Sequence, residues 1–246
     1  MSTAATEVSV LDNPVWASLT GVHAGLAEIA GRAGRYLPDV APFVALSDPA
    51  DPAAWADLAR LIGPGGELTL AGVDEIPHGW TVLGEVPGVQ LVATSLRARP
   101  DDTARRLGND DVPAMLDLVR RTEPGPFRPR TIDLGSYLGI HHDGVLVAMA
   151  GERLRPPGWT EISAVCTDPA YRGQGLATRL VRAVAAGIQD RGDTPFLHTS
   201  AANTAAIRLY ESLGFTLRRN LMFRLLRTPD RPRWRGPDDG NLLGGQ

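Results

Sequence analysis

Two segments in the C-terminal half constrain the fold of this chain most strongly. The first, residues 165–177, reads V-C-T-D-P-A-Y-R-G-Q-G-L-A and predicts a strand, a glycine-bearing turn and a helix start in succession. The second, residues 203–215, reads N-T-A-A-I-R-L-Y-E-S-L-G-F and predicts a helix that carries Asn203 and Tyr210 on one face. Free backbone N–H groups at such a turn attract phosphate. The two segments together predict a pocket for a phosphorylated ligand with a phenol beside it.

The composition excludes several classes of function. The 246 residues carry a net charge of -3, which gives no general attraction to nucleic acid or to an anionic membrane surface. The chain contains no lysine, so all 25 basic residues are arginines. Schiff-base chemistry, pyridoxal-phosphate chemistry and a P-loop lysine are therefore excluded. The length predicts one large or two small domains.

Cysteine content and hydropathy bear on the compartment. Cys166 is the single cysteine and cannot form an internal disulfide, and no N-terminal segment resembles a signal peptide. No apolar run has the length that a bilayer crossing needs. We therefore expect a protein of the reducing cytoplasm, without a membrane or nucleic-acid partner. The oligomeric state stays open, a homodimer included.

Residues 1–98 are predicted to form a small α/β half that carries no catalytic motif. Apolar spacing and turn residues define its expected elements. These are helices over residues 14–36 and 53–62 and strands over residues 42–46, 67–71, 80–85 and 89–94.

A second domain is expected over residues 99–227, after a polar, proline-marked boundary. Its expected elements are a strand over residues 104–107, a helix over 112–121, a loop over 123–130, a hairpin of 137–142 with 145–154, and a strand over 159–167. Residues 228–246 are rich in Pro, Gly, Arg and Asp and are expected to form a disordered tail.

A Gly-x-Gly turn is a weak signal when it stands alone. A dinucleotide fold would need a third glycine, an early βαβ unit and an acidic residue after its second strand, and these are not convincingly present. A nucleotide oxidoreductase stays an alternative, which NAD binding without coenzyme A binding would support.

The motifs themselves resemble a known superfamily. Arg172-x-x-Gly175-x-Ala177 looks like the acyl-CoA-binding signature of the GNAT superfamily of N-acyltransferases, and the Asn203 to Phe215 segment looks like its following helix-to-strand segment. The resemblance covers roughly residues 102–227. The layout of the first half also resembles the degenerate N-terminal half of the glycine N-acyltransferase-like branch. The resemblance implies an α/β fold with a mixed, mostly antiparallel sheet flanked by helices.

The resemblance implies acetyl-CoA, or another acyl-CoA, as co-substrate. The pantetheine arm would pair with the strand edge at Val165 and Thr167, where this strand splays from its neighbour, and would contact Asn203. The diphosphate would be held by backbone N–H groups of Arg172, Gly173, Gln174, Gly175, Leu176 and Ala177.

Tyr210 is the natural general acid, because a phenol with an ordinary pKa near about 10 can protonate a departing thiolate. The alternative is a core aromatic at a helix end. For Asn203 the alternative is an N-cap, which is compatible with ligand contact.

Glu161 is the candidate general base for the attacking amine. It alternates with Ser163, Val165 and Thr167 in the sequence, so we expect all four on one strand face. The alternative is a solvated acid on an edge strand. The rival bases are His141, His142 and His198. We expect no metal site, because these histidines lack acidic or cysteine companions at ligand spacing.

Cys166 is expected to face away from Val165 and Thr167 as a small buried residue. A ping-pong mechanism through an acyl-cysteine would require this thiol in the cleft beside a histidine. We favour direct transfer, because binding both substrates side by side supplies the proximity that a covalent step would otherwise provide. The expected reaction moves an acetyl or short acyl group to a primary amine of a small molecule, amino acid or peptide. The opposed hypothesis is a non-catalytic acyl-CoA-binding regulatory module.

Overall fold

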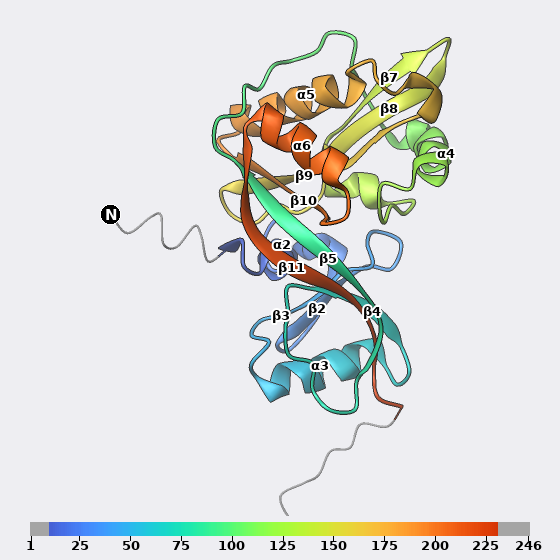
Figure 1. Cartoon of the computed structure of the whole chain (residues 1–246). Helices are drawn as coiled ribbons and strands as arrows, with labels where there is room; N and C mark the ends of the chain where they lie inside the picture. The colour runs from blue at the N-terminus through green and yellow to red at the C-terminus, as the bar shows by residue number, and fades with distance from the viewer. Residues whose placement is uncertain (1–9, 231–246) are drawn as a thin grey trace, which may run out of the picture.

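The computed structural model describes residues 10–230 of the chain. Figure 1 shows an elongated arrangement, with α5 (Leu176–Asp190) and α6 (Thr204–Leu213) near one end and α3 (Pro52–Ile62) near the other. The structure also contains α2 (Pro14–Leu19), α4 (Val112–Thr122) and the short 3-10 helices η1 (Ala24–Leu26), η2 (Asn109–Asp111), η3 (Thr131–Leu134) and η4 (Pro169–Tyr171). The tail expected over residues 228–246 lies outside the described residues from residue 231 onward.

Eight strands form one sheet in the order β4-β11-β5-β10-β9-β8-β7-β6. Their bounds are Glu67–Ala71 (β4), Thr81–Ala93 (β5), Arg105–Arg106 (β6), Tyr137–His142 (β7), Val145–Glu152 (β8), Trp159–Thr167 (β9), Thr194–Ser200 (β10) and Phe215–Arg227 (β11). Each neighbouring pair is antiparallel except β9 and β10, which are parallel. The predicted α/β class with a mixed, mostly antiparallel sheet flanked by helices is confirmed.

Strand β5 comes from the first half of the chain but lies inside the sheet of the second half. It pairs with β10 on one side and with β11 on the other. Figure 1 shows β5 and β11 as a long twisted ribbon that joins the two ends of the molecule. The strands predicted over residues 80–85 and 89–94 are one continuous strand. Pro87 does not interrupt it, because the pairing of β5 with β10 ends at Gly88 and Pro87 lies beyond that end. The N–H that proline lacks is therefore not needed for strand pairing.

The helix predicted over residues 14–36 was wrong beyond Leu19. Strands β1 (Ala27–Ala30) and β2 (Ala33–Tyr36) instead form an antiparallel hairpin, and β2 pairs with β3 (Val44–Leu46). This segment contains four glycines, which lower helix propensity, so strand pairing prevails over the apolar spacing that suggested a helix.

The hairpin of β1 and β2 depends on contacts that the apolar spacing in the sequence does not reveal. Gly31 turns the chain at φ +58°, and a Cβ atom there would lie 2.2 Å from an Asp57 carboxylate oxygen. Val22 and Ile29, which suggested a buried helix face, are 57% and 46% exposed. The hairpin therefore depends on a contact with α3, which is distant in the sequence.

Two layers cover the large sheet. Helices α5 and α6 pack on one face, where the apolar stripe of α5 joins the largest core cluster. The N-terminal half packs on the other face, where Phe43 and Leu11 share a cluster with Phe196 of β10. The predicted hairpin turn is confirmed, because Asp143 and Gly144 both have positive φ angles. Between residues 10 and 230, no helix combines the length and apolar composition that a membrane crossing requires.

Candidate active site

Strands β9 and β10 separate part-way along their length. They pair only between Thr194–Phe196 and Trp159–Glu161. Beyond this point β10 stays with β5, while β9 stays with β8. Within the described residues, the edge of β9 after Glu161 therefore has no strand partner on the β10 side. The Thr167 carbonyl accepts a hydrogen bond from Arg172 Nε at 3.3 Å, so a ligand that pairs with this edge would share or displace that contact.

A cavity of about 790 Å³ opens at this separation. It runs between β9, the turn before α5, the start of α6 and the loop after α4. Most of the predicted ligand-binding residues line it, but Glu161 and Gln174 do not. Those that do are Val165, Thr167, Arg172, Gly173, Gly175, Leu176, Ala177, Asn203 and Tyr210.

The turn before α5 exposes a row of backbone donors. Gly173 and Gly175 have φ angles of +78° and +75°, and a Cβ atom on either would meet open space. Among the described residues, no oxygen accepts a hydrogen bond from the backbone N–H groups of residues 173–178. These donors point from a helix N-terminus, so their chemistry fits the diphosphate of an acyl-CoA.

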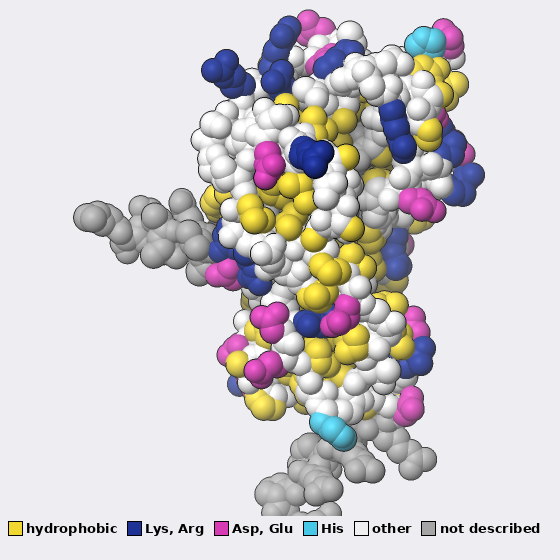
Figure 2. All heavy atoms as spheres, in the orientation of Figure 1, with side chains coloured by type: hydrophobic (Ala, Val, Ile, Leu, Met, Phe, Trp, Pro, Cys, Tyr) yellow, Lys and Arg dark blue, Asp and Glu magenta, His cyan; other side chains and the backbone are white. Residues whose placement is uncertain are grey.

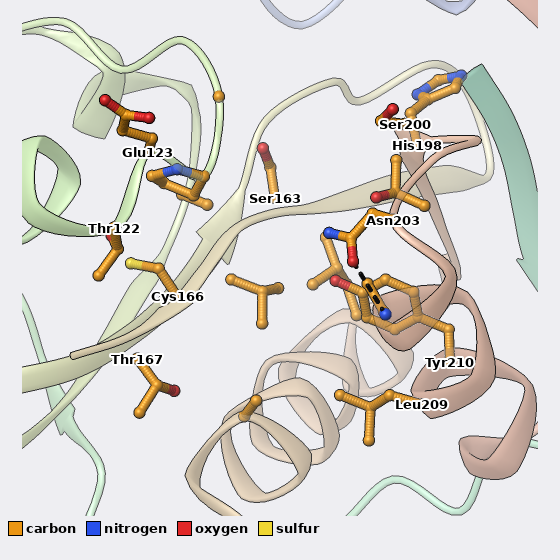
Figure 3. Close-up of a pocket in the computed structure, with 18 of the residues that line it drawn as sticks. Thr122, Glu123, Ser163, Cys166, Thr167, His198, Ser200, Asn203, Leu209 and Tyr210 are labelled. Carbon is orange, nitrogen blue, oxygen red and sulfur yellow. Dashed lines mark hydrogen bonds between the residues drawn. The ribbon is translucent and has the colours of Figure 1, made fainter. Parts of the chain in front are cut away.

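Helix α6 brings two predicted residues to the same cavity. Asn203 caps the helix, and its Oδ1 accepts a hydrogen bond from the Ala206 backbone N–H at 3.1 Å (Figure 3). Tyr210 is 8% exposed, and its hydroxyl has no hydrogen-bond partner among the described residues. Burial, with a smaller contribution from Cys166, raises the pKa of Tyr210 to about 12. The phenol therefore stays protonated at neutral pH.

Glu161 is fully buried and lies in a three-residue ionic cluster. Its carboxylate accepts hydrogen bonds from Arg153 Nε at 2.8 Å, Arg153 Nη2 at 2.6 Å and His198 Nδ1 at 2.7 Å. Burial by itself would raise the pKa of Glu161, but Arg153 and then His198 outweigh it and hold this pKa at about 2. An ionised carboxylate only accepts hydrogen bonds, so His198 Nδ1 carries a proton.

The face predicted for Glu161 was wrong in one respect. The pairing of β8 with β9 shifts by one residue between Met149 and Gly151, and Ala164 has φ +52°. This β-bulge reverses the alternation, so Glu161 and Ser163 lie on the opposite face from Val165 and Thr167. Alternation along a strand holds only while its register is regular.

Cys166 lines the cavity on the side of the loop after α4. Figure 3 shows Cys166 beside Thr122, across the cavity from His198 and Tyr210. It is 7% exposed and faces away from Val165, as predicted. Burial raises the pKa of this thiol to about 11, although hydrogen bonds with Thr122 and the Met149 backbone oppose the shift. A protonated thiol is a weak nucleophile.

The FR47-like protein family matches residues 137–224, from β7 into β11. The [Ribosomal protein bS18]-alanine N-acetyltransferase of Escherichia coli is 32% identical over 128 residues, which cover 48% of this chain and 86% of that enzyme. A GNAT-family protein of known structure from Novosphingobium aromaticivorans is 43% identical, with a TM-score of 0.80 over 88% of this chain and 97% of its own.

The chain belongs to the GNAT family of acetyltransferases.

Other relatives match a shorter part of this GNAT chain. The mycothiol acetyltransferase of Thermobispora bispora is 41% identical over 105 residues, which are 41% of this chain and 35% of that enzyme. The N-alpha-acetyltransferase RimI of Mycobacterium tuberculosis is 39% identical over 82 residues, 32% of this chain and 51% of that enzyme. The chain thus spans about a third and about half of these two curated relatives. The narrower resemblance to glycine N-acyltransferases stays a prediction.

The GNAT chain also has site residues that sequence analysis missed. Arg153 lines the cavity and pairs with Glu161, yet neither the charge nor the local pattern singled it out. A usable signal was present, because the two residues oppose each other across the turn at residues 156–158. Between residues 10 and 230, no group of three or more His, Cys, Asp or Glu side chains is placed to hold a metal ion.

Proposed function

We propose that this GNAT chain transfers an acetyl group from acetyl-CoA directly to a primary amine. The observation that carries the proposal is the row of free N–H groups over residues 173–178, on the same cavity as the open edge of β9 and the Tyr210 hydroxyl. One cavity therefore offers groups that could bind a diphosphate, pair with an extended pantetheine arm and donate a proton. The names of two relatives, an N-alpha-acetyltransferase and a [Ribosomal protein bS18]-alanine N-acetyltransferase, describe acetyl transfer to nitrogen and support this acceptor class.

Ligand binding is assigned to the residues around the turn and the strand edge. The N–H groups of Gly173 to Ala177 would hold the diphosphate, whereas the predicted donor Arg172 N–H already donates to the Pro169 carbonyl at 3.5 Å. The β9 edge at Val165 and Thr167 would pair with the pantetheine amides. Thr167 supports this assignment, because its buried Oγ1 has no hydrogen-bond partner within the described residues. Asn203 would contact the same arm. Acetyl-CoA, when bound, supplies the acetyl group as an activated thioester.

Proton transfer is assigned to Tyr210 and His198 on the cavity wall, with Glu161 behind His198. Tyr210 donates its phenolic proton to the departing thiolate. His198 lines the cavity, and Glu161 behind it stabilises an imidazolium through the 2.7 Å contact to Nδ1. His198 Nε2 lies 3.0 Å from Gln90 Nε2, so it accepts the amine proton after this contact opens. Glu161 thus contributes to the base through His198, because its own pKa is too low for efficient proton uptake.

The experiment is a calorimetric titration of the full chain with acetyl-CoA, followed by an amine screen that detects free coenzyme A. We expect acetyl-CoA to bind and at least one primary amine to release coenzyme A. Gly175→Ala adds a methyl group at the proposed diphosphate site and should weaken acetyl-CoA binding. Gly192→Ala is the matched control, because Gly192 has φ +85° and open space at its Cβ but does not line the cavity.

Three results would contradict the proposal. An absence of heat on titration with acetyl-CoA would show that acetyl-CoA is not the ligand. Binding of NAD in its place would favour an oxidoreductase. Equal weakening by both glycine variants would show that strain, not obstruction, acts at Gly175. Binding without turnover on any amine would favour the non-catalytic acyl-CoA-binding module.

A further inference from the structure

A second cavity, of about 320 Å³, adjoins the first. The two cavities share a wall of four side chains, Phe43, Arg153, His198 and Phe223. The second cavity lies between the N-terminal half and the face of the large sheet that α5 does not cover. It is therefore the space that the N-terminal half adds to the transferase site.

Arg153 presents free hydrogen-bond donors at this junction. Its Nε and one Nη2 proton donate to Glu161, and among the described residues no oxygen accepts a hydrogen bond from Nη1. The side chain is 12% exposed, and its guanidinium carbon lies 4.9 Å from the centre of the Phe43 ring. Glu161 and Phe43 thus hold the guanidinium in place, with its outer edge toward the cavities.

The free edge of Arg153 fits one carboxylate. Two parallel N–H groups of a guanidinium match the two oxygens of a planar carboxylate. A dianionic phosphate fits less well, because the buried negative charge of Glu161 lies on the adjacent edge. Glu161 Oε1 accepts hydrogen bonds from both Arg153 and His198, so a carboxylate on Arg153 lies next to His198.

The second cavity is mainly apolar beyond this point. Two acidic side chains line its rim: Asp12 is paired with Arg218 and Arg219, and Asp48 Oδ1 accepts a hydrogen bond from the Ala50 backbone N–H at 2.9 Å. The apolar lining of the second cavity consists of Leu11, Pro14, Val15, Val44, Ala45, Leu46, Pro49, Leu70, Ala71, Val73, Leu154 and Leu221, beside Phe43 and Phe223. This lining favours an apolar side chain and disfavours a charged one.

From these observations we propose that the acceptor is a free α-amino acid with an apolar side chain. Its carboxylate binds the outer edge of Arg153, its side chain occupies the second cavity, and its amine faces His198 and the opening beside β9. An α-amino acid suits this geometry, because amine and carboxylate share one carbon and the two protein groups are neighbours. The inference rests on the proposed acetyl transfer and names its substrate class.

The test compares ligands of the wild-type chain, so it does not depend on the folding of a variant. Calorimetry without coenzyme A measures the binding of L-phenylalanine, phenylalaninamide and phenethylamine, the last of which lacks the carboxylate. We expect L-phenylalanine to bind about tenfold or more tightly than either of the others, as a charged hydrogen-bond pair implies. The same order is expected in kcat/KM with acetyl-CoA.

A matched pair of variants assigns the effect to Arg153. Arg153→Lys keeps the charge but loses the planar fork, so it should reduce the preference for L-phenylalanine over phenethylamine. Arg191→Lys is the control, because Arg191 pairs with the buried Glu152 at 2.7 Å and lines neither cavity. It should leave the preference unchanged.

Each alternative result overturns the inference. Equal affinity for L-phenylalanine and phenethylamine would show that no carboxylate is recognised. Equal affinity for L-phenylalanine and phenylalaninamide would point to a peptide N-terminus as the acceptor. If no amine is acetylated but L-phenylalanine binds with the expected preference, the proposed function fails and the binding site stands. If other amines are acetylated without that preference, only this inference fails.

Discussion

Tyr210→Phe isolates the chemistry of one hydroxyl from the packing of its ring. The ring packs edge-on against Phe215 with 6.0 Å between centroids, and a phenylalanine keeps that contact. The hydroxyl has no hydrogen-bond partner among the described residues, so its loss should change the free energy of unfolding by less than about 0.5 kcal/mol. The affinity for acetyl-CoA should also change little.

The expected loss of turnover follows from the acidity of the phenol. Burial raises the pKa of Tyr210 to about 12, well above the value of about 8.5 that is typical of a thiol. Proton donation from Tyr210 to a thiolate of ordinary pKa is therefore uphill, which places the effect near the lower end of general acid catalysis, about 100-fold in kcat. The raised pKa also predicts that kcat shows no decline from Tyr210 ionisation near pH 10, where an ordinary tyrosine would ionise.

The assay measures the rate of coenzyme A release with saturating amine, and thermal unfolding is measured in parallel. Tyr137→Phe is the control, because its hydroxyl is also buried without a hydrogen-bond partner but does not line the cavity. The control should keep full turnover. Full turnover in Tyr210→Phe would refute the acid role, and lost acetyl-CoA binding would show that the hydroxyl serves binding instead.

Three further predictions concern mechanism and stability. Cys166→Ala should keep most of the turnover with intersecting initial-velocity patterns, because the thiol stays protonated; abolished turnover or parallel patterns would support an acyl-cysteine. Burial lowers the pKa of His23 from 6.5 to about 4, so the unfolded chain binds a proton first as pH falls, and stability should drop by about 3 kcal/mol from pH 6.5 to 4. His23→Gln should remove this loss in denaturant titrations, and an unchanged pH dependence would contradict it. Gly214→Ala should destabilise by about 3 kcal/mol or more, because φ is +100° and the new Cβ would lie 2.5 Å from a Ser95 backbone atom; Gly192→Ala, with open space, should cost only about 1 kcal/mol in the same melts.

The predictions from sequence were accurate where the stabilising interactions join residues close in the sequence, and they failed where these interactions join distant residues. Helix α5 and the turn before it were predicted well, because glycine conformations and apolar spacing act within a few residues. The segment after Leu19 was predicted as helix, but its hairpin depends on pairing with β3 and on Asp57. Strand β5 was predicted in two parts, since only the position of β10 shows that Pro87 is tolerated there. Short-range sequence patterns therefore located the motifs, but they did not show which distant segments pack against them.

Sequence alone determined the glycine turn before α5 and the helix face with Asn203 and Tyr210, because both depend on spacing within a single turn or helix. Tertiary structure decided what surrounds them. The bulge at Ala164 places Glu161 on the other face. Arg153, directly after β8, and His198 on β10 make it a buried ionic partner and not the solvated acid that the sequence allowed. The physical reason is that register, burial and charge pairing are set between strands, and the chain order of residues does not contain them.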